Sequence, residues 1–175
     1  IFPARVFQAA FFGNCRMEHE TFRVRLAKLL QKSRKALRLY SLMGGSQGGR
    51  AAELRELQAQ EWRAVNAALL ERLTTVLEPG GGRQLVAETC AARDYFYEQW
   101  RDAEAELHRA HKELIAAADG GDFVRAANLC RKLVGLKARV QACQAAQHEL
   151  RLVIEQSRVS APAIELTPEH ALAPT

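Results

Sequence analysis

The residues best suited to chemistry in this sequence are two histidines and a glutamate that follow one another at helical spacing. Glu104, His108 and His111 lie four and three residues apart, so a helix places their side chains on one face. Imidazole nitrogens and carboxylate oxygens are zinc ligands, but one helix alone completes no such site, and the sequence offers no matching cluster. The Glu-x-x-His motifs of di-iron bundles are also absent. We therefore interpret this face as a solvated polar surface, and we predict no metal and no cofactor.

A glycine-rich stretch at Gly44–Arg50 resembles a phosphate-binding loop in composition only. Such a loop requires Lys and then Ser or Thr after its last glycine, and a strand before it. Arg50 and Ala51 stand at those positions, and no strand is predicted upstream. No Gly-x-Ser-x-Gly motif, Cys–His pair or pair of buried carboxylates indicates nucleophilic or acid–base catalysis. We therefore predict a protein that is not an enzyme and has no catalytic residues.

The four cysteines indicate a cellular environment rather than a reaction. Cys15, Cys90, Cys130 and Cys143 form no Cys-x-x-Cys pair and fall at or near apolar positions of predicted helices. Free cysteines of this kind behave as small hydrophobic side chains. We expect an intracellular, reducing compartment, such as the cytoplasm, the nucleus or an organelle matrix.

The beginning of the chain is apolar but too short to cross a bilayer. A transmembrane helix needs about 20 apolar residues, whereas the stretch Ile1–Phe12 is shorter and contains Arg5. We expect a helix that docks apolar side chains, and no membrane span. Because the chain begins with Ile1, we also expect a fragment or a processed product.

These residues must be carried by helices. Hydrophobic residues make up 48% of the chain and charged residues 26%, a balance typical of a folded protein. Glycine-rich breaks at Gly44–Gly49, Glu78–Gly82 and Asp119–Asp122 separate stretches in which apolar residues recur every three or four positions. This pattern predicts an all-α fold of long antiparallel helices joined by Gly-rich turns, either an up-down bundle or coiled-coil hairpins.

The breaks divide the chain into four predicted parts. They are an N-terminal amphipathic basic helix (1–43), a helical hairpin (49–118), a turn with a C-terminal helix (119–157) and a disordered tail (158–175). We expect a break within the first helix at Gly13-Asn14, where a helix is least favoured. The tail is predicted from three prolines among small residues.

The third break and its flanks carry the most specific pattern of the sequence. Three alanines (Ala116–Ala118) allow close approach of two helices, Gly120 and Gly121 form the turn, and Asp122 is a good N-cap. We predict that Phe123 folds back onto the apex of this hairpin. The expected inner face consists of Ala126, Ala127, Leu129, Leu133 and Leu136.

The stretch 113–136 resembles the UVR motif, a short helical hairpin found in UvrB, UvrC and in ClpC- and McsA-type stress proteins. The family pattern has an Ala pair, Asp-Phe, two residues, Ala-Ala, one residue, Leu, and further apolar residues. It is matched without gaps by Ala116, Ala117, Asp122, Phe123, Ala126, Ala127, Leu129, Leu133 and Leu136. Cys130-Arg131 departs from the usual Arg-Asp, which puts a charge-paired contact in doubt. The resemblance implies an interaction module that associates with a partner hairpin and has no catalytic residues of its own.

An aromatic cluster on the third predicted helix is the second candidate for partner binding. Tyr95, Phe96, Tyr97 and Trp100 wrap around the helix, so some rings must point outward unless another element covers them. They either pack under another helix or form a binding hot spot. The full set of candidate partner-binding residues is Phe123, Ala126, Ala127, Leu129, Leu133, Tyr95 and Trp100.

Two basic runs contribute to the net charge of +5. The first contains Arg23, Arg25, Lys28, Lys32, Arg34, Lys35 and Arg38, and the second contains Arg125, Arg131, Lys132, Lys137 and Arg139. Neither run includes an acidic residue. The first run could follow a phosphate backbone, or the cations could pair with acidic residues of neighbouring helices or of a partner protein. An amphipathic helix of the calmodulin-target or membrane-surface type is a further alternative for Phe22–Tyr40.

Two functions therefore compete. The first is a non-catalytic helical scaffold or adaptor that uses the UVR-like hairpin to bind another helical protein or a second copy of itself. The alternative is a nucleic-acid-associated subunit, linked to repair or to the ribosome, that binds phosphates through the first basic run.

Overall fold

The described part of the chain is a bundle of four long helices, as the sequence predicted. The computed structural model describes residues 5–42, 49–78 and 84–158, with side chains described between residues 20 and 157 of these ranges. The helices are α1 (Arg5–Leu42), α2 (Arg50–Leu77), α3 (Leu85–Asp119) and α4 (Phe123–Arg158). These ranges contain no strand. The predicted tail lies outside the described residues, apart from Arg158.

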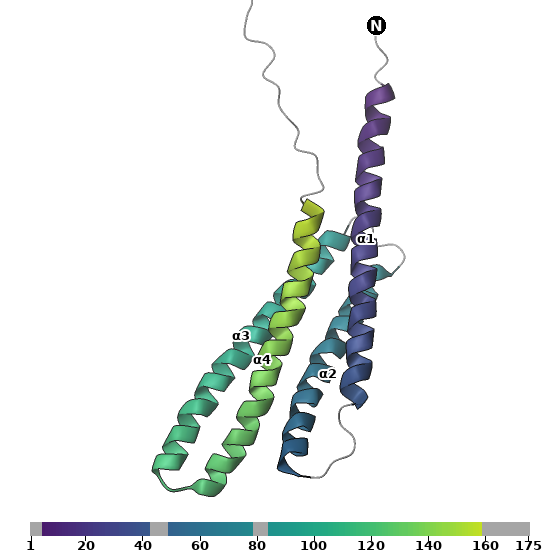
Figure 1. Ribbon diagram of the computed structural model, residues 1–175. Coiled ribbons are helices and arrows are strands. Elements are labelled where there is room, and N and C mark those ends of the chain that lie inside the picture. The colour runs from purple at the N-terminus through teal and green to yellow at the C-terminus, as the bar shows by residue number, and fades with distance from the viewer. Residues whose placement is uncertain (1–4, 43–48, 79–83, 159–175) are drawn as a thin grey trace, which may run out of the picture.

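Successive helices run in opposite directions, so α2 and α4 run parallel to each other (Figure 1). α3 and α4 form the most extensive pair, α1 packs on α2, and α4 lies between α3 and α2. α2 and α3 share only a small contact. Residues 49–118, predicted as one hairpin, therefore contribute one helix to each of two hairpins. The apolar spacing had shown that each helix has a buried face, but it carried no information on which neighbour covers that face.

α1 is continuous across Gly13 and Asn14, so the break expected there is wrong. Glycine costs a helix interior about 1 kcal/mol relative to alanine, which weakens a long helix without ending it. The other breaks are confirmed, since α1 ends at Leu42, α2 ends at Leu77 and α3 ends at Asp119. Within the described residues, no helix is both long enough and apolar enough to cross a membrane.

The hydrophobic core occupies the half of the bundle where all four helices meet. Its largest fully buried apolar side chains come from every helix: Leu26, Leu73, Leu85, Phe96 and Leu150. The cluster also contains Phe22, Leu29, Val65, Leu69, Val76, Val153 and the smaller residues Ala92, Ala142, Cys143 and Ala146. Burying a side chain of this size contributes about 1.5–3 kcal/mol, so this half carries most of the stability.

Toward the turn at 120–122, the contact between α3 and α4 is built from smaller residues. Ala103, Ala110 and Ala117 are buried on α3 at intervals of seven residues, the repeat typical of coiled coils. On α4, Leu129 and Leu136 are buried. The alanines allow α4 to approach α3 closely, and we call this end of the α3–α4 hairpin the arm.

Candidate protein-interaction surface

The turn between α3 and α4 has the geometry that its sequence predicted. Gly121 adopts a φ of +73°, in the left-handed region that favours glycine. The amide of Asp122 donates to the carbonyl of Ala117 at 2.9 Å, and the carboxylate of Asp122 accepts from the amide of Arg125 at 3.0 Å. Asp122 is therefore the N-cap of α4, and both ends of the turn are fixed by hydrogen bonds.

The end of this hairpin exposes large apolar side chains. Phe123 and Val124 are each 76% exposed, and Ile115 on the facing helix is 52% exposed. The prediction that Phe123 folds back onto the apex is wrong. Successive residues of a helix are rotated by about 100°, so Phe123 projects from α4 well away from the side on which Leu129 and Leu136 meet α3.

A groove continues from this apolar end between the first turns of α2 and α4. Its volume is about 310 Å³, and it is lined by Arg50, Glu53, Leu54, Ala127, Cys130, Arg131 and Val134. Phe123, Ala127, Cys130 and Val134 follow one another at intervals of four, three and four, so they form one line along α4. Arg131 Nε lies 3.4 Å from the carboxylate of Glu53 across the groove. We call Ile115, Phe123, Val124 and the groove residues Leu54, Ala127, Cys130 and Val134 the tip surface.

The hairpin residues predicted to bind a partner divide between the tip surface and the interior. Phe123 and Ala127 belong to the tip surface, while Ala126 and Leu133 are half-buried. Leu129 is buried, so it supports the arm rather than offering a contact. Sequence reasoning missed Val124, Ile115 and the groove residues other than Ala127. The line from Phe123 to Val134 was visible in the spacing, but its exposure depends on where α2 begins.

Tyr95 and Trp100 do not join the tip surface. Trp100 and Ile115 are separated by 15 residues of α3, which correspond to about 22 Å of helix. Tyr95 and Trp100 are half-buried and pack against the core, and the Cζ atom of Arg72 lies 3.4 Å above the centroid of the Tyr95 ring. Within the described residues, Trp100 Nε1 is buried without a hydrogen-bond partner. Of the two alternatives for the aromatic cluster, packing against another helix is confirmed for Tyr95.

Most cations of the second basic run contact side chains of neighbouring helices. Arg125 lies 3.8 Å from Glu113, Lys132 lies 2.9 Å from Glu106, and Arg131 contacts Glu53 as described above. The hydrogen bond from Lys132 is the main cause that lowers the pKa of Glu106 below its ordinary value. Arg139 donates to the side chain of Gln99 at 3.2 Å. Four of the five cations of this run are thus occupied by neighbouring helices.

The first basic run is only partly occupied. Arg23 donates to the carbonyl of Leu77 at 2.9 Å, Lys32 lies 2.5 Å from the carboxylate of Glu149, and Arg25 is half-buried. The other four cations, Lys28, Arg34, Lys35 and Arg38, are exposed and form no ion pair with any described residue. Val24, Leu39 and Leu42 are exposed on the same helix. The outer face of α1 is therefore both basic and apolar.

The histidines and cysteines show no cluster suited to a metal. Within the described ranges, no three His, Cys, Asp or Glu residues are grouped to hold an ion. His108 Nδ1 lies 2.8 Å from the backbone carbonyl of Glu104. Cys143 is buried, and desolvation raises the pKa of its thiol to about 11. Cys130 is exposed in the groove and Cys90 is half-buried, while the side chain of Cys15 lies outside the described residues.

Comparison with known proteins adds no relative. The chain matches no protein-family model, no curated protein and no solved structure. The resemblance of residues 113–136 to the UVR motif therefore stays a prediction, and the functional argument depends on the geometry of the chain itself.

Proposed function

We propose that this chain is a non-catalytic helical scaffold or adaptor that binds another helical protein, or a second copy of itself, through the tip surface. The observation that carries this proposal is the pair Phe123 and Val124, each three-quarters exposed at the end of a long arm. Scattered apolar residues on a surface need no explanation, but adjacent large ones next to a groove are typical of binding sites.

The arm is suited to binding because it is already ordered. The alanine contact between α3 and α4 and the hydrogen bonds at Asp122 hold the tip in one conformation. A preordered surface loses little conformational entropy when a partner binds. The UVR resemblance implies association with a partner hairpin and falls on the same arm, although it was drawn from sequence alone.

The shape of the groove favours a helix as the partner element. Ala127, Cys130 and Val134 provide small to medium apolar positions, and Leu54 closes one side. An amphipathic helix that places apolar residues at i, i+3, i+4 and i+7 fits such a groove. Arg131 is paired with Glu53, so Arg50, exposed at the edge of the groove, is the cation that favours an acidic residue beside the apolar face of that helix.

The experiment compares two matched double variants. Phe123→Ser with Val124→Ser removes the apolar tip, whereas Tyr97→Ser with Val86→Ser removes exposed apolar residues at the other end of α3, where each is 43% exposed. Self-association is measured by sedimentation velocity, and affinity for any protein recovered with the wild type is then measured with purified components. We expect the tip variant to bind at least about tenfold more weakly, which corresponds to about 1.4 kcal/mol. Equal binding by the two variants would contradict the proposal.

The outer face of α1 supports a second candidate function, binding to nucleic acid. Lys28, Lys35 and Arg38 are exposed without ion pairs in the described part of the chain, so they are available to phosphates. Replacing all three by Glu should remove about three units from the slope of log affinity against log salt concentration. If the variant binds DNA and RNA as the wild type does, this function fails. The exposed Leu39 and Leu42 on the same helix have no role in phosphate contact, and for this reason we place it second.

A further inference from the structure

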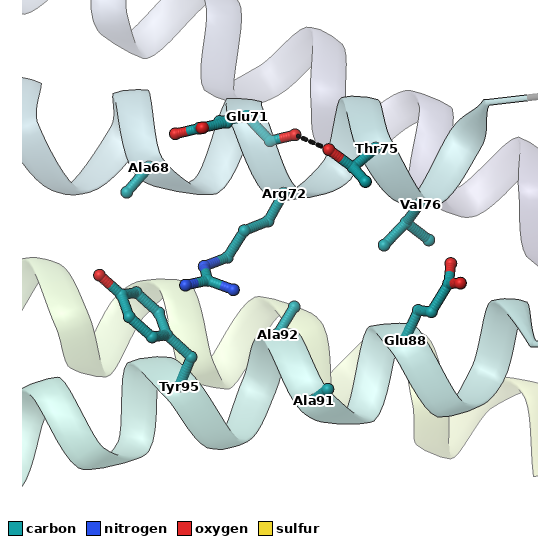
Figure 2. A pocket seen from close by; sticks show the side chains of 9 residues that line it. All are labelled: Ala68, Glu71, Arg72, Thr75, Val76, Glu88, Ala91, Ala92 and Tyr95. Carbon is teal, nitrogen blue, oxygen red and sulfur yellow. Dashed lines mark hydrogen bonds between the residues drawn. The ribbon is translucent and has the colours of Figure 1, made fainter.

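A second pocket lies between α2 and α3, away from the tip surface (Figure 2). Its volume is about 440 Å³, within the range of small-molecule sites. It is lined by Ala68, Glu71, Arg72, Thr75, Val76, Glu88, Ala91, Ala92 and Tyr95. The space exists because three of these residues are alanines, at a place where two helices with little mutual contact diverge.

Arg72 reaches across this pocket from α2 to α3 (Figure 2). Its guanidinium lies on the ring of Tyr95, with 3.4 Å between Cζ and the ring centroid. Stacking uses one face of the guanidinium and leaves its N–H donors, which point outward in the plane of the group. Within the described residues, Arg72 forms no ion pair or side-chain hydrogen bond. A half-buried guanidinium held in this way is suited to a carboxylate, which it binds through two parallel hydrogen bonds.

An acidic side chain faces the same space from the other helix. The carboxylate of Glu88 rises from α3 toward Val76, while Arg72 lies toward Tyr95, and Ala92 and Ala91 lie on the α3 surface between them (Figure 2). The carboxylate of Glu71 points away from Glu88 in this view. The hydroxyl of Thr75 donates to the backbone carbonyl of Glu71 at 3.2 Å, so it is already used. The pocket thus presents a cation at one end, an anion at the other and an apolar floor.

The charges of the lining decide which ligand fits. One Arg against two Glu residues leaves a formal charge of −1, which disfavours a phosphate dianion. We propose that the pocket binds a small zwitterion, such as an amino acid, whose carboxylate pairs with Arg72 and whose ammonium group faces Glu88. A short aliphatic chain of the ligand covers Ala91 and Ala92. This site is independent of the tip surface.

The test uses the full chain and three probes of similar size: 4-aminobutanoate, butanoate and butylamine. Amide chemical shifts of Ala91, Ala92 and Tyr95 are followed by NMR as each probe is added. Because the probes are small, we expect 4-aminobutanoate to bind with a dissociation constant of about 1 mM. The two probes that carry a single charge should bind at least about tenfold more weakly. Inorganic phosphate should bind no better than butanoate.

Two variants test separately the residue that binds the carboxylate of the ligand and the residue that faces its ammonium group. Arg72→Lys keeps the positive charge and the contact with Tyr95 but loses the paired donors, so the affinity for 4-aminobutanoate should fall about tenfold. Glu88→Gln should abolish the preference for 4-aminobutanoate over butanoate. Glu98→Gln and Arg101→Gln, at exposed positions of α3 outside the pocket, are the controls and should change neither result. Equal affinity of the wild type for 4-aminobutanoate and butanoate, or no saturable shift at the pocket, would overturn the proposal.

Discussion

The two ends of this bundle differ in whether their large apolar side chains are buried or exposed. In the half where four helices meet, aromatic and aliphatic side chains such as Phe96 and Leu150 are almost completely buried. At the end of the α3–α4 arm, Phe123 and Val124 are mostly exposed. The difference lies in the number of neighbouring helices. All four helices contribute to the buried half, whereas α1 contributes nothing to the tip surface, which is formed by α3, α4 and the first turn of α2. An apolar residue there is available to another molecule, and the following predictions test this contrast.

The largest effect should separate the two phenylalanines. Phe96→Ala removes a fully buried ring and should lower the free energy of unfolding by about 3–5 kcal/mol. Phe123→Ala removes an exposed ring and should change the free energy of unfolding by no more than about 0.5 kcal/mol. Urea denaturation followed by circular dichroism measures both. Similar losses in the two variants would show that the tip is part of the core.

A medium effect should show how tightly α3 and α4 approach each other. Ala110→Leu inserts three carbons between the helices of the arm and should cost about 1–3 kcal/mol. Ala105→Leu, at an exposed position of the same helix, is the matched control and should be close to neutral. Thermal unfolding of the two variants tests whether the alanine contact is close-packed. A loosely packed arm would accept both substitutions equally.

The buried Cys143 and the exposed Cys130 should differ in their rate of alkylation. With a pKa of about 11, only about one Cys143 thiol in a thousand is ionised at pH 8, and the side chain is also buried. Cys130 is exposed in the groove, so iodoacetamide should modify it much faster than Cys143. Peptide mass spectrometry of the alkylated protein gives both rates.

The raised pKa of Cys143 also predicts a pH dependence of stability. Because folding favours the neutral thiol, its contribution is complete below the ordinary pKa of 9.0 and is lost as the pH rises toward 11. The difference in unfolding free energy between the wild type and Cys143→Ala should therefore shrink from pH 9 to pH 11. A difference that stays constant over this range would contradict the buried, neutral thiol.

The smallest effect concerns the ion pair between Lys132 and Glu106. Lys132→Met removes the hydrogen bond that lowers the pKa of Glu106, so this pKa should rise toward its ordinary value. Both side chains are substantially exposed, so the loss of stability near neutral pH should be under about 1 kcal/mol. The contribution of this pair is present above the ordinary pKa of Glu106 and is lost as the pH falls through the lowered one. An NMR titration of the Glu106 carboxyl group measures the shift, and an unchanged pKa would contradict the pairing.

The sequence predicted where the helices begin and end better than it predicted which helices pack against one another. The glycine-rich stretches and the apolar spacing located the three breaks between the helices and the N-cap at Asp122. These features depend on residues that are close in the sequence. The sequence also predicted that the helices on either side of the turn at 120–122 pack together, which α3 and α4 do. It did not predict that α2 packs on α1 and α4 more than on α3, since an apolar stripe does not specify the helix that covers it. The exposure of Phe123 and the pocket around Arg72 depend on that pairing and were therefore missed. The sequence left open whether the basic runs pair with acidic residues of neighbouring helices. Acidic residues of α2 and α3 pair with three of the five cations of the second run.

We propose that the tip of the α3–α4 arm is the surface that meets another protein. The most direct measurement is photo-crosslinking in living cells, with the photoreactive residue p-benzoylphenylalanine placed at Val124 in one protein and at Val86 in another. Both positions are exposed valines. Val86 lies in the first turn of α3 and Val124 in the first turn of α4, so they are at opposite ends of the α3–α4 hairpin. The account predicts a discrete crosslinked protein from position 124 and none from position 86. Crosslinks of equal yield from both positions, or from position 86 alone, would contradict it.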